Sequence, residues 1–291
     1  MSLSEIQKKI VEAEEEKIIV LSAAASGKTA VLTERVRHLL NSGIDPKEIV
    51  VITFTNAAAE ELNERLNKPT GLFVGTIHSY ANYLLRASGH DTTKILDEEK
   101  FNKLFYEIKK NISCVKHVSH LLLDEAQDST PEQFEFLLDL VDPDNYMLVG
   151  DVRQSIYRWA GAFPDYILEL MNNPYVTVYE LNENYRNGNE ILRFAKNIIA
   201  LAGSSYRDYS VAMCEQPGKV IEVPFSADGI ARSIASYKGK FGDWFVLTRT
   251  NDEISTMCRS LERFGVPYDT FKKASLTSNE LNEKMKANTV K

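Results

Sequence analysis

Short runs of apolar residues recur along this chain, and most are followed by a stretch whose apolar residues are spaced as on one face of a helix. The runs lie at residues 18–21, 49–54, 72–76, 118–123, 146–149 and 176–181. Continuous aliphatic and β-branched runs of this length are typical of parallel strands that are buried on both faces. Because strands alternate with helical segments, the pattern predicts an α/β fold built on a parallel sheet.

Several helix boundaries can be predicted from the residues that flank these runs. Residues 4–7 (SEIQ) fit a capping box at a helix start, and Gly43 fits the end of the helix that follows the first strand. Thr55 and Asn56 are suited to cap a helix over residues 57–66. The charged stretch 90–117 predicts a small helical insertion, with a helix near residues 98–112.

The first strand leads into a candidate phosphate-binding loop. Small residues follow Leu21, and Gly27, Lys28 and Thr29 then open an amphipathic helix. The backbone N–H groups at such a helix start can cradle an anion, Lys28 can reach the outer phosphates, and the Thr29 hydroxyl can bind Mg²⁺. The consensus first glycine is replaced by Ser22, so a strand–loop–helix without nucleotide stays open at this point.

Three carboxylates follow the strand at residues 118–123. Asp124, Glu125 and Asp128 would repel one another unless a cation balanced them, and Mg²⁺ with a nucleotide is the economical cation. In that arrangement Asp124 holds the metal through water, and Glu125 orients or deprotonates the attacking water. An Asp-Glu strand end downstream of Gly-Lys-Thr makes a specific pair of signals.

Other polar and aromatic residues fall where parallel sheets bind ligands, at the carboxyl ends of strands. They are Thr53, Thr55, Asn56, Thr76 and His78, and each has the plainer alternative of capping a helix. Tyr157 and Trp159, near basic residues, suit base stacking, and the alternative for Trp159 is a core aromatic. Gln7 could read an adenine edge, but the residues alone favour the cap.

Composition narrows the classes of function. The 291 residues suffice for about two domains, and a net charge of −7 argues against a broad basic nucleic-acid surface while allowing a local groove. Three widely separated cysteines form no zinc spacing and suit a reducing, cytoplasmic environment. The longest apolar runs are too short to cross a membrane, so no membrane partner is expected.

The chain resembles a UvrD/Rep-type superfamily I DNA helicase, with AddA and RecB as relatives. Seven segments match that family's motifs in order: Gln7 (Q motif), 23–29 (I), 53–62 (Ia), 75–79 (Ib), 124–128 (II), 150–162 (III) and 181–186 (IV). Residues 246–251 resemble the segment that follows in the family's second motor domain.

The resemblance implies a fold, an activity and a role for each matching residue. The fold would be two RecA-like P-loop NTPase domains, residues 1–175 with an insertion near 84–117 and a partial second domain over 176–291. ATP hydrolysis with Mg²⁺ would drive 3′ to 5′ movement on single-stranded DNA, in repair or recombination. The implied catalytic residues are Lys28, Glu125, Gln154 and Arg186. The implied nucleotide-binding residues are Gln7, Ala24, Ala25, Ser26, Gly27, Lys28, Thr29, Tyr185 and Arg186. The implied metal ligands are Thr29 and Asp124. The implied DNA-binding residues are Phe54, Asn56, Thr76, His78, Tyr157 and Trp159.

The chain also departs from the family pattern. Ala25 stands where a glycine is usual, which makes the loop stiffer, and Ala160 stands where relatives often carry arginine. Both large family insertions are missing, and the chain ends at Lys291 before motifs V and VI. We therefore expect little activity from residues 1–291 alone, unless a partner or a continuation supplies those motifs. The alternative function is a module that binds ATP and DNA without turnover.

Overall fold

The computed structural model describes residues 3–97, 101–201, 203, 208–222, 224, 226–237 and 244–270. The chain forms two compact units, Met1–Val220 and Ile221–Lys291. The first unit carries every strand of the larger sheet and all the residues of the candidate site described below. The expected chain end at Asn288–Lys291 lies outside the described residues.

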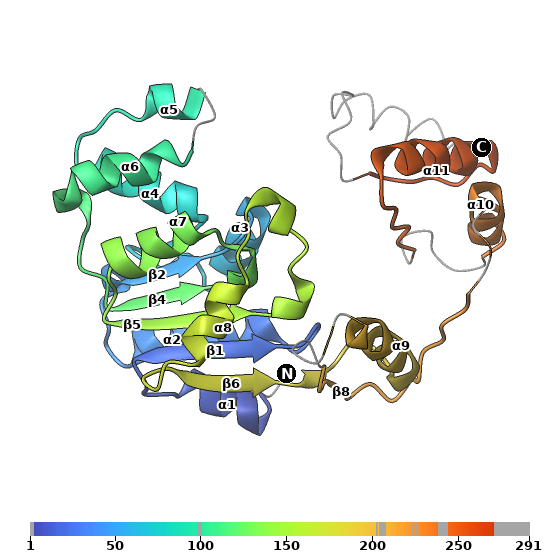
Figure 1. The fold of residues 1–291 in the computed structure, drawn as a ribbon, viewed down its shortest axis with the longest axis horizontal. Helices are drawn as coiled ribbons and strands as arrows, with labels where there is room; N and C mark the ends of the chain where they lie inside the picture. The colour runs from blue at the N-terminus through green and yellow to red at the C-terminus, as the bar shows by residue number, and fades with distance from the viewer. Residues whose placement is uncertain are drawn as a thin grey trace. The chain divides into compact units, whose positions relative to one another are not determined.

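A six-stranded parallel sheet forms the centre of the first unit (Figure 1). Its strands are β1 Lys17–Ser22, β2 Ile49–Ile52, β3 Phe73–Gly75, β4 His120–Leu123, β5 Asn145–Gly150 and β6 Thr177–Leu181. Their order across the sheet is β3-β2-β4-β5-β1-β6, and every neighbouring pair is parallel. The predicted α/β class and parallel sheet are therefore confirmed. All six strands coincide with the apolar runs, because only such runs can be buried on both faces.

Helices connect the strands and cover both faces of the sheet (Figure 1). Those of the first unit are α1 Glu5–Val11, α2 Lys28–Asn41, α3 Asn56–Arg65, α4 Ile77–Ala87, α5 Thr93–Asp97, α6 Lys103–Lys110, α7 Pro131–Phe134, α8 Asp165–Met171 and α9 Asn189–Ala200. Ser4 and Gln7 form the predicted capping box of α1. The Thr55 and Thr76 hydroxyls accept the backbone N–H groups of Ala58 and Ser79 and so cap α3 and α4.

The two faces of the sheet bury separate apolar clusters. Alternate strand residues such as Ile18 and Val20 point toward α1, α2 and α3, where Leu32 and Leu62 are fully buried. The intervening residues, such as Ile19, point to the opposite face, which is covered by α4, α6 and α8. This double burial fixes the sheet and therefore fixes the loops at the carboxyl ends of its strands.

The boundary between units differs from the one expected at residue 175. Thr177–Leu181 pairs with β1 along its whole length, from Ile18↔Thr177 to Ser22↔Leu181, and so completes the first sheet. A second, two-stranded parallel sheet follows, in which β7 Glu183–Asn184 pairs with β8 Val211–Ala212. The contact boundary lies after Val220, in keeping with the pairing of β6 with β1 and with the hydrogen bonds of Asn184 and Tyr185 to the loop after β1.

The second unit is described by itself. Its helices α10 Ala227–Ala235 and α11 Asn251–Arg263 pack through a small cluster that includes Ile234, Met257 and Leu261. Asp228 joins the two helices, since it accepts hydrogen bonds from Ser260 and Arg263. A partial RecA-like sheet in this part of the chain stays a prediction.

Candidate nucleotide site and aromatic surface

The loop between β1 and α2 has the backbone of a phosphate cradle. Ala25 has a φ of 56° and Gly27, the N-cap of α2, has a φ of 86°. A side chain at Gly27 would also place its Cβ 2.7 Å from Nε2 of Gln7, so this position requires glycine. Ala25 adopts the left-handed region despite its Cβ, which strains the loop by about 1 kcal/mol. The loop is therefore strained at the position where a glycine was expected, and its stiffening stays a prediction.

Lys28 and Glu125 meet at the mouth of this loop. The Lys28 Nζ atom lies 2.7 Å from Oε2 of Glu125, and the two side chains are 14% and 33% exposed. Lys28 is the first residue of α2, and Glu125 follows β4 with a left-handed φ of 51°. The parallel sheet brings together two strand ends that lie far apart in the sequence. Lys28, which is expected to hold the outer phosphates, and Glu125, which is expected to activate water, are thus in direct contact.

Asp124 and Asp128 add negative charge beside this ion pair. The pKa of Asp124 is raised to about 6, mainly by burial and then by the neighbouring charge of Glu125, while Lys28 opposes the rise. The pKa of Asp128 is raised to about 6 for the same reasons, burial first. Such carboxylates fit a divalent cation, which would restore their ionised form. Thr29 lies in the first turn of α2. In the described part of the chain, no three acidic, histidine or cysteine residues cluster as a metal site by themselves.

Gln7 combines the two roles that its sequence position allowed. Its Oε1 accepts the backbone N–H of Ser4 at 3.0 Å, which is the predicted cap. Its Nε2 donates to the carbonyl of Ser26 at 3.0 Å, so the same amide also contacts the phosphate loop. The cap is confirmed, and contact with adenine stays a prediction.

The segment with Tyr185 and Arg186 is fastened to the loop by Asn184, a residue that the sequence analysis did not single out. The fully buried Asn184 donates to the carbonyl of Ala24 at 2.7 Å, and its Oδ1 accepts the backbone N–H groups of Arg186 and Asn187. Tyr185 N–H donates to the carbonyl of Ala25. An Asn two residues before an expected phosphate-binding arginine was the available signal, because Asn readily forms such turns.

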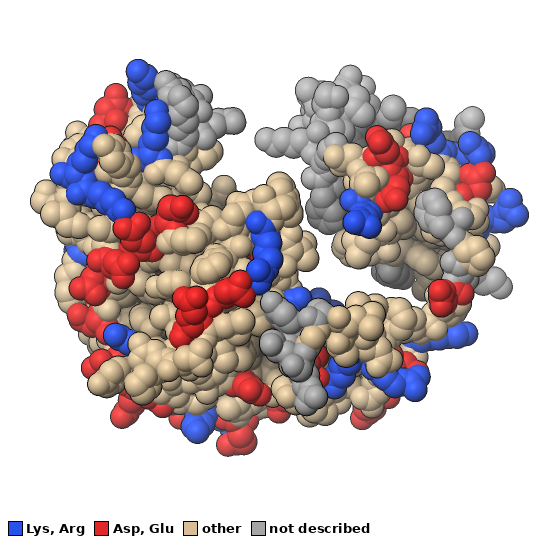
Figure 2. Space-filling model, viewed as in Figure 1, with Lys and Arg blue, Asp and Glu red and all other residues tan. Residues whose placement is uncertain are grey.

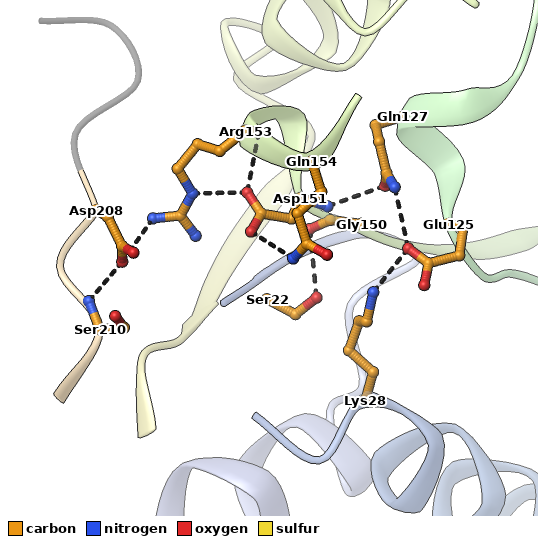
Figure 3. Close-up of polar contacts among 10 residues, drawn as sticks. All are labelled: Ser22, Lys28, Glu125, Gln127, Gly150, Asp151, Arg153, Gln154, Asp208 and Ser210. Atoms are coloured by element: carbon orange, nitrogen blue, oxygen red, sulfur yellow. Dashed lines mark hydrogen bonds and ion pairs between the residues drawn. The ribbon is translucent and has the colours of Figure 1, made fainter. Parts of the chain in front are cut away.

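Gln127 is a second residue that the sequence analysis missed, and it links two strand ends (Figure 3). Its Nε2 donates to Oε2 of Glu125 at 3.0 Å, and its Oε1 accepts the backbone N–H of Asp151 at 2.9 Å. Asp151 in turn accepts a hydrogen bond from Nε2 of Gln154 at 2.8 Å. Gln154 is therefore connected to Glu125 through two buried side chains, Gln127 and Asp151.

Three of the predicted DNA-binding residues form one aromatic surface, namely Phe54, Tyr157 and Trp159. The ring centroids of Phe54 and Tyr157 are 5.2 Å apart, and those of Tyr157 and Trp159 are 6.3 Å apart. Trp159 is 83% exposed, so the alternative of a core aromatic is wrong. The rings come from two loops, after β2 and after β5, and present apolar faces to solvent. Such an arrangement can stack unpaired bases.

The other three predicted DNA-binding residues have different surroundings. Thr76 caps α4, and Asn56 is an exposed first residue of α3. His78 stacks on Phe105 of α6 with centroids 5.2 Å apart, and its Nε2 lies 3.2 Å from Oδ1 of Asn102. The insertion therefore holds the His78 ring. Acidic and basic side chains both occur across the face shown in Figure 2.

Comparison with known sequences identifies the family to which the chain belongs. The profile of the UvrD/REP helicase N-terminal domain matches residues 3–117 and 107–174. The chain belongs to this family. The matched part of this UvrD/REP family member contains the phosphate loop, the Asp124–Asp128 segment and the aromatic surface. The resemblance seen in the motifs is confirmed.

Curated relatives of this UvrD/REP family member are named helicases. The ATP-dependent DNA helicase Rep of Buchnera aphidicola (from Acyrthosiphon pisum) is 25% identical over 96% of the chain and 59% of the relative. DNA helicase II of Escherichia coli K12 is 26% identical over 68% of the chain and 40% of the relative. The helicase PcrA of Bacillus subtilis is 24% identical over 92% and 50%, respectively. The chain thus spans about half the length of the curated relatives it matches.

Two further observations complete the comparison. The crystal structure of Pif1 helicase from Candida albicans aligns with a TM-score of 0.46 and 17% identity, covering 92% of this chain and 56% of that one. Among the described helices, none is both long and apolar enough to cross a bilayer.

Proposed function

We propose that this chain is the ATP-hydrolysing part of a DNA helicase or translocase that moves 3′ to 5′ on single-stranded DNA, in repair or recombination. The observation that carries the proposal is the contact of Lys28 with Glu125 at the mouth of the strained loop. This contact brings together a lysine suited to bind phosphate and a carboxylate suited to activate water. The relatives' names as ATP-dependent DNA helicases support the same activity.

The loop residues fit the phosphates of ATP. Ser26 is buried, and its hydroxyl lacks a hydrogen-bond partner among the described residues, so a ligand oxygen would satisfy it. Residues 24–29 would surround the phosphates with backbone N–H groups, and Lys28 would leave Glu125 for the outer phosphates. Gln7 and Tyr185 would hold the adenine from either end of the site.

The carboxylate cluster fits Mg²⁺ bound together with the nucleotide. Thr29 and Asp124 would hold the ion, Asp124 through water, and the ion would neutralise charge on the phosphates. Glu125, once separated from Lys28, is positioned to accept a proton from an attacking water. Gln154 would contact the outer phosphate, and Arg186, held beside the loop by Asn184, would stabilise negative charge there.

The aromatic surface is proposed as the base-stacking part of the DNA path. Phe54, Tyr157 and Trp159 would stack successive bases, while Asn56, Thr76 and His78 would contact the strand on the neighbouring loops. Tyr157 and Trp159 follow Gln154 in the same loop after β5. Movement of Gln154 on nucleotide hydrolysis would therefore shift Tyr157 and Trp159 and the bases stacked on them. A second motor domain beginning in the second unit would complete such a cycle.

Replacement of Lys28 tests the nucleotide site. Lys28→Ala should abolish ATP binding, because it removes the cation at the mouth of the phosphate loop, and should leave the fold intact. Titration with a fluorescent ATP analogue measures the binding. Lys68→Ala is the matched control, since it breaks an exposed Lys–Glu pair between Lys68 and Glu60 and should bind ATP normally. Equal ATP affinity in the Lys28→Ala variant and the unmodified chain would exclude this loop as the nucleotide site.

Steady-state ATP hydrolysis distinguishes the motor from the alternative function, a module that binds ATP and DNA without turnover. With single-stranded oligonucleotide present, a motor hydrolyses ATP faster, and Glu125→Gln should remove that hydrolysis while retaining nucleotide binding. Partial duplexes with either a 3′ or a 5′ tail then report direction. Residues 1–291 alone should hydrolyse ATP slowly, so the assay is made with and without a continuation or partner that supplies motifs V and VI. Tight binding of both ligands with no oligonucleotide-dependent hydrolysis even in the completed protein would support the module and exclude the motor.

A further inference from the structure

A continuous chain of polar contacts runs from the phosphate loop to Asp208, beyond α9 (Figure 3). It passes from Lys28 to Glu125 and Gln127, and then to Asp151, as described above. Arg153 extends the chain, because its Nε donates to Oδ1 of Asp151 at 2.6 Å and its Nη1 donates to Oδ1 of Asp208 at 3.1 Å. The side chains of Arg153 and Asp208 are only 10% and 11% exposed.

Asp208 is also tied to the phosphate loop from the other side. Its Oδ1 accepts the backbone N–H of Ser210 at 2.8 Å, immediately before β8. Strand β8 pairs with β7, which contains Asn184, the residue that donates to the carbonyl of Ala24. The contacts therefore form a closed ring that begins and ends in the phosphate loop, and Asp208 lies where its two arms meet.

We propose that Asp208 is a positioning residue for ATP hydrolysis, acting through Arg153 and Asp151 on Gln154. This inference rests on the proposed function. The carboxylate of Asp151 only accepts hydrogen bonds, so the amide nitrogen of Gln154 must face it. Arg153 contacts Asp151 through both its backbone N–H and its side chain, and Asp208 holds the far end of that guanidinium. Loss of the Asp208 charge leaves Arg153, and with it Asp151 and Gln154, less firmly oriented.

The ion pair between Arg153 and Asp208 is suited to orient Arg153 because both side chains are nearly buried. A buried pair in which each partner has further hydrogen bonds is held in one geometry, whereas an exposed pair exchanges freely with water. Arg158 and Asp165 provide the contrast, since their ion pair arises from the same region but its side chains are 50% and 38% exposed. Disruption of that pair should not reach Gln154.

The test compares the Asp208→Asn, Asp208→Glu and Asp165→Asn variants of the whole chain. Asparagine keeps the acceptor for Ser210 but removes the charge, so Asp208→Asn should lower kcat for ATP hydrolysis about tenfold and leave KM for ATP unchanged. Asp208→Glu should recover most of the rate, and Asp165→Asn should hydrolyse ATP at the full rate. In a Gln154→Ala background, Asp208→Asn should cause no further loss, because both changes act on one residue.

Thermal unfolding without nucleotide tests the contact between Arg153 and Asp208 independently of ATP hydrolysis. Arg153→Gln and Asp208→Asn should each lower the midpoint by roughly 2–4 °C, and the double variant should fall by less than their sum. Full turnover by Asp208→Asn, or the same loss in the Gln154→Ala background, would overturn the positioning role of Asp208 while leaving the proposed function standing. Unchanged ATP affinity in the Lys28→Ala variant would overturn both, because the nucleotide would then not bind at this loop.

Discussion

Asp124 is ionisable, largely buried and adjacent to Glu125, and these properties set its effect on stability. Its raised pKa of about 6 means that the folded chain holds a proton which the unfolded chain, with a pKa near 4, has already lost. Between these two pKa values the folded state binds more protons. The free energy of unfolding therefore decreases as pH rises through this window, and the whole decrease is present at neutral pH.

Asp124→Asn should therefore stabilise the nucleotide-free chain at pH 7 by about 2 kcal/mol, since a neutral amide carries no desolvated charge. The asparagine Oδ1 can still accept the Glu125 N–H, so the local turn is kept. Urea unfolding at pH 4 and pH 7 measures the effect. The gain should vanish at pH 4, where the aspartate is already protonated, and an equal gain at both values would show that charge is not its origin.

Single residues divide clearly into those that the sequence could and could not predict. Lys28, Glu125 and Gln154 could be predicted to lie at neighbouring strand ends, because their motifs each follow a strand directly, and their functional roles stay predictions. Gln127, Asn184 and Asp208 act through partners more than 20 residues away along the chain. Their long-range contacts depend on which strand ends become neighbours, and an unaligned sequence contains no such information. Only the local turn at Asn184 could have been expected from the sequence.

At the scale of elements, burial on both faces made the strands predictable. Most positions of β1, β2, β4 and β5 are apolar and buried, so their period could not be confused with that of an exposed helix. The short strands β7 and β8 could not be predicted in this way, because each has two residues and little apolar content to bury. The contact boundary differs from the expected domain boundary for a related reason, since nothing in residues 176–181 tells which sheet they complete.

The aromatic surface yields a prediction at the same scale, because it is assembled by the loops after β2 and β5. Trp159→Ala should weaken binding of single-stranded DNA by about 1–3 kcal/mol, the usual contribution of one stacked base. The thermal midpoint should stay unchanged, because the exposed indole buries little area. Fluorescence anisotropy with a labelled oligonucleotide and a thermal melt on the same preparation measure both.

Tyr175→Ala is the matched control for this variant. Tyr175 is 81% exposed, as an aromatic residue just before β6, and lies outside the aromatic surface. Its replacement should alter neither the DNA affinity nor the midpoint. A Trp159→Ala chain that binds the oligonucleotide with unchanged affinity would contradict the stacking role, whatever its midpoint.

At the scale of the molecule, the first unit has everything that an autonomous domain requires. Both faces of its sheet are covered by its own helices, with separate buried clusters on each face. The described part of the second unit buries a much smaller apolar cluster around Met257 and Leu261. Apolar area buried on folding is the main favourable contribution to stability, so the two units should differ strongly when separated.

Residues 1–220 should therefore fold alone, unfold cooperatively and bind ATP with an affinity close to that of the whole chain. Residues 221–291 alone should show no cooperative transition. Circular dichroism during thermal unfolding, combined with ATP titration of the first fragment, checks both expectations. A fragment 1–220 that melts gradually would show that its two clusters need residues beyond Val220.

The place of β1 in the sheet also affects how the protein is made. This apolar strand leaves the ribosome well before both of its neighbours, β5 and β6, which begin only at Asn145 and Thr177. At about 5–20 residues per second, synthesis leaves both edges of β1 unpaired for on the order of ten seconds. The strand that ends in the phosphate loop is thus the part of the nascent chain most exposed to misassociation, and it is where a chaperone would have most to shield.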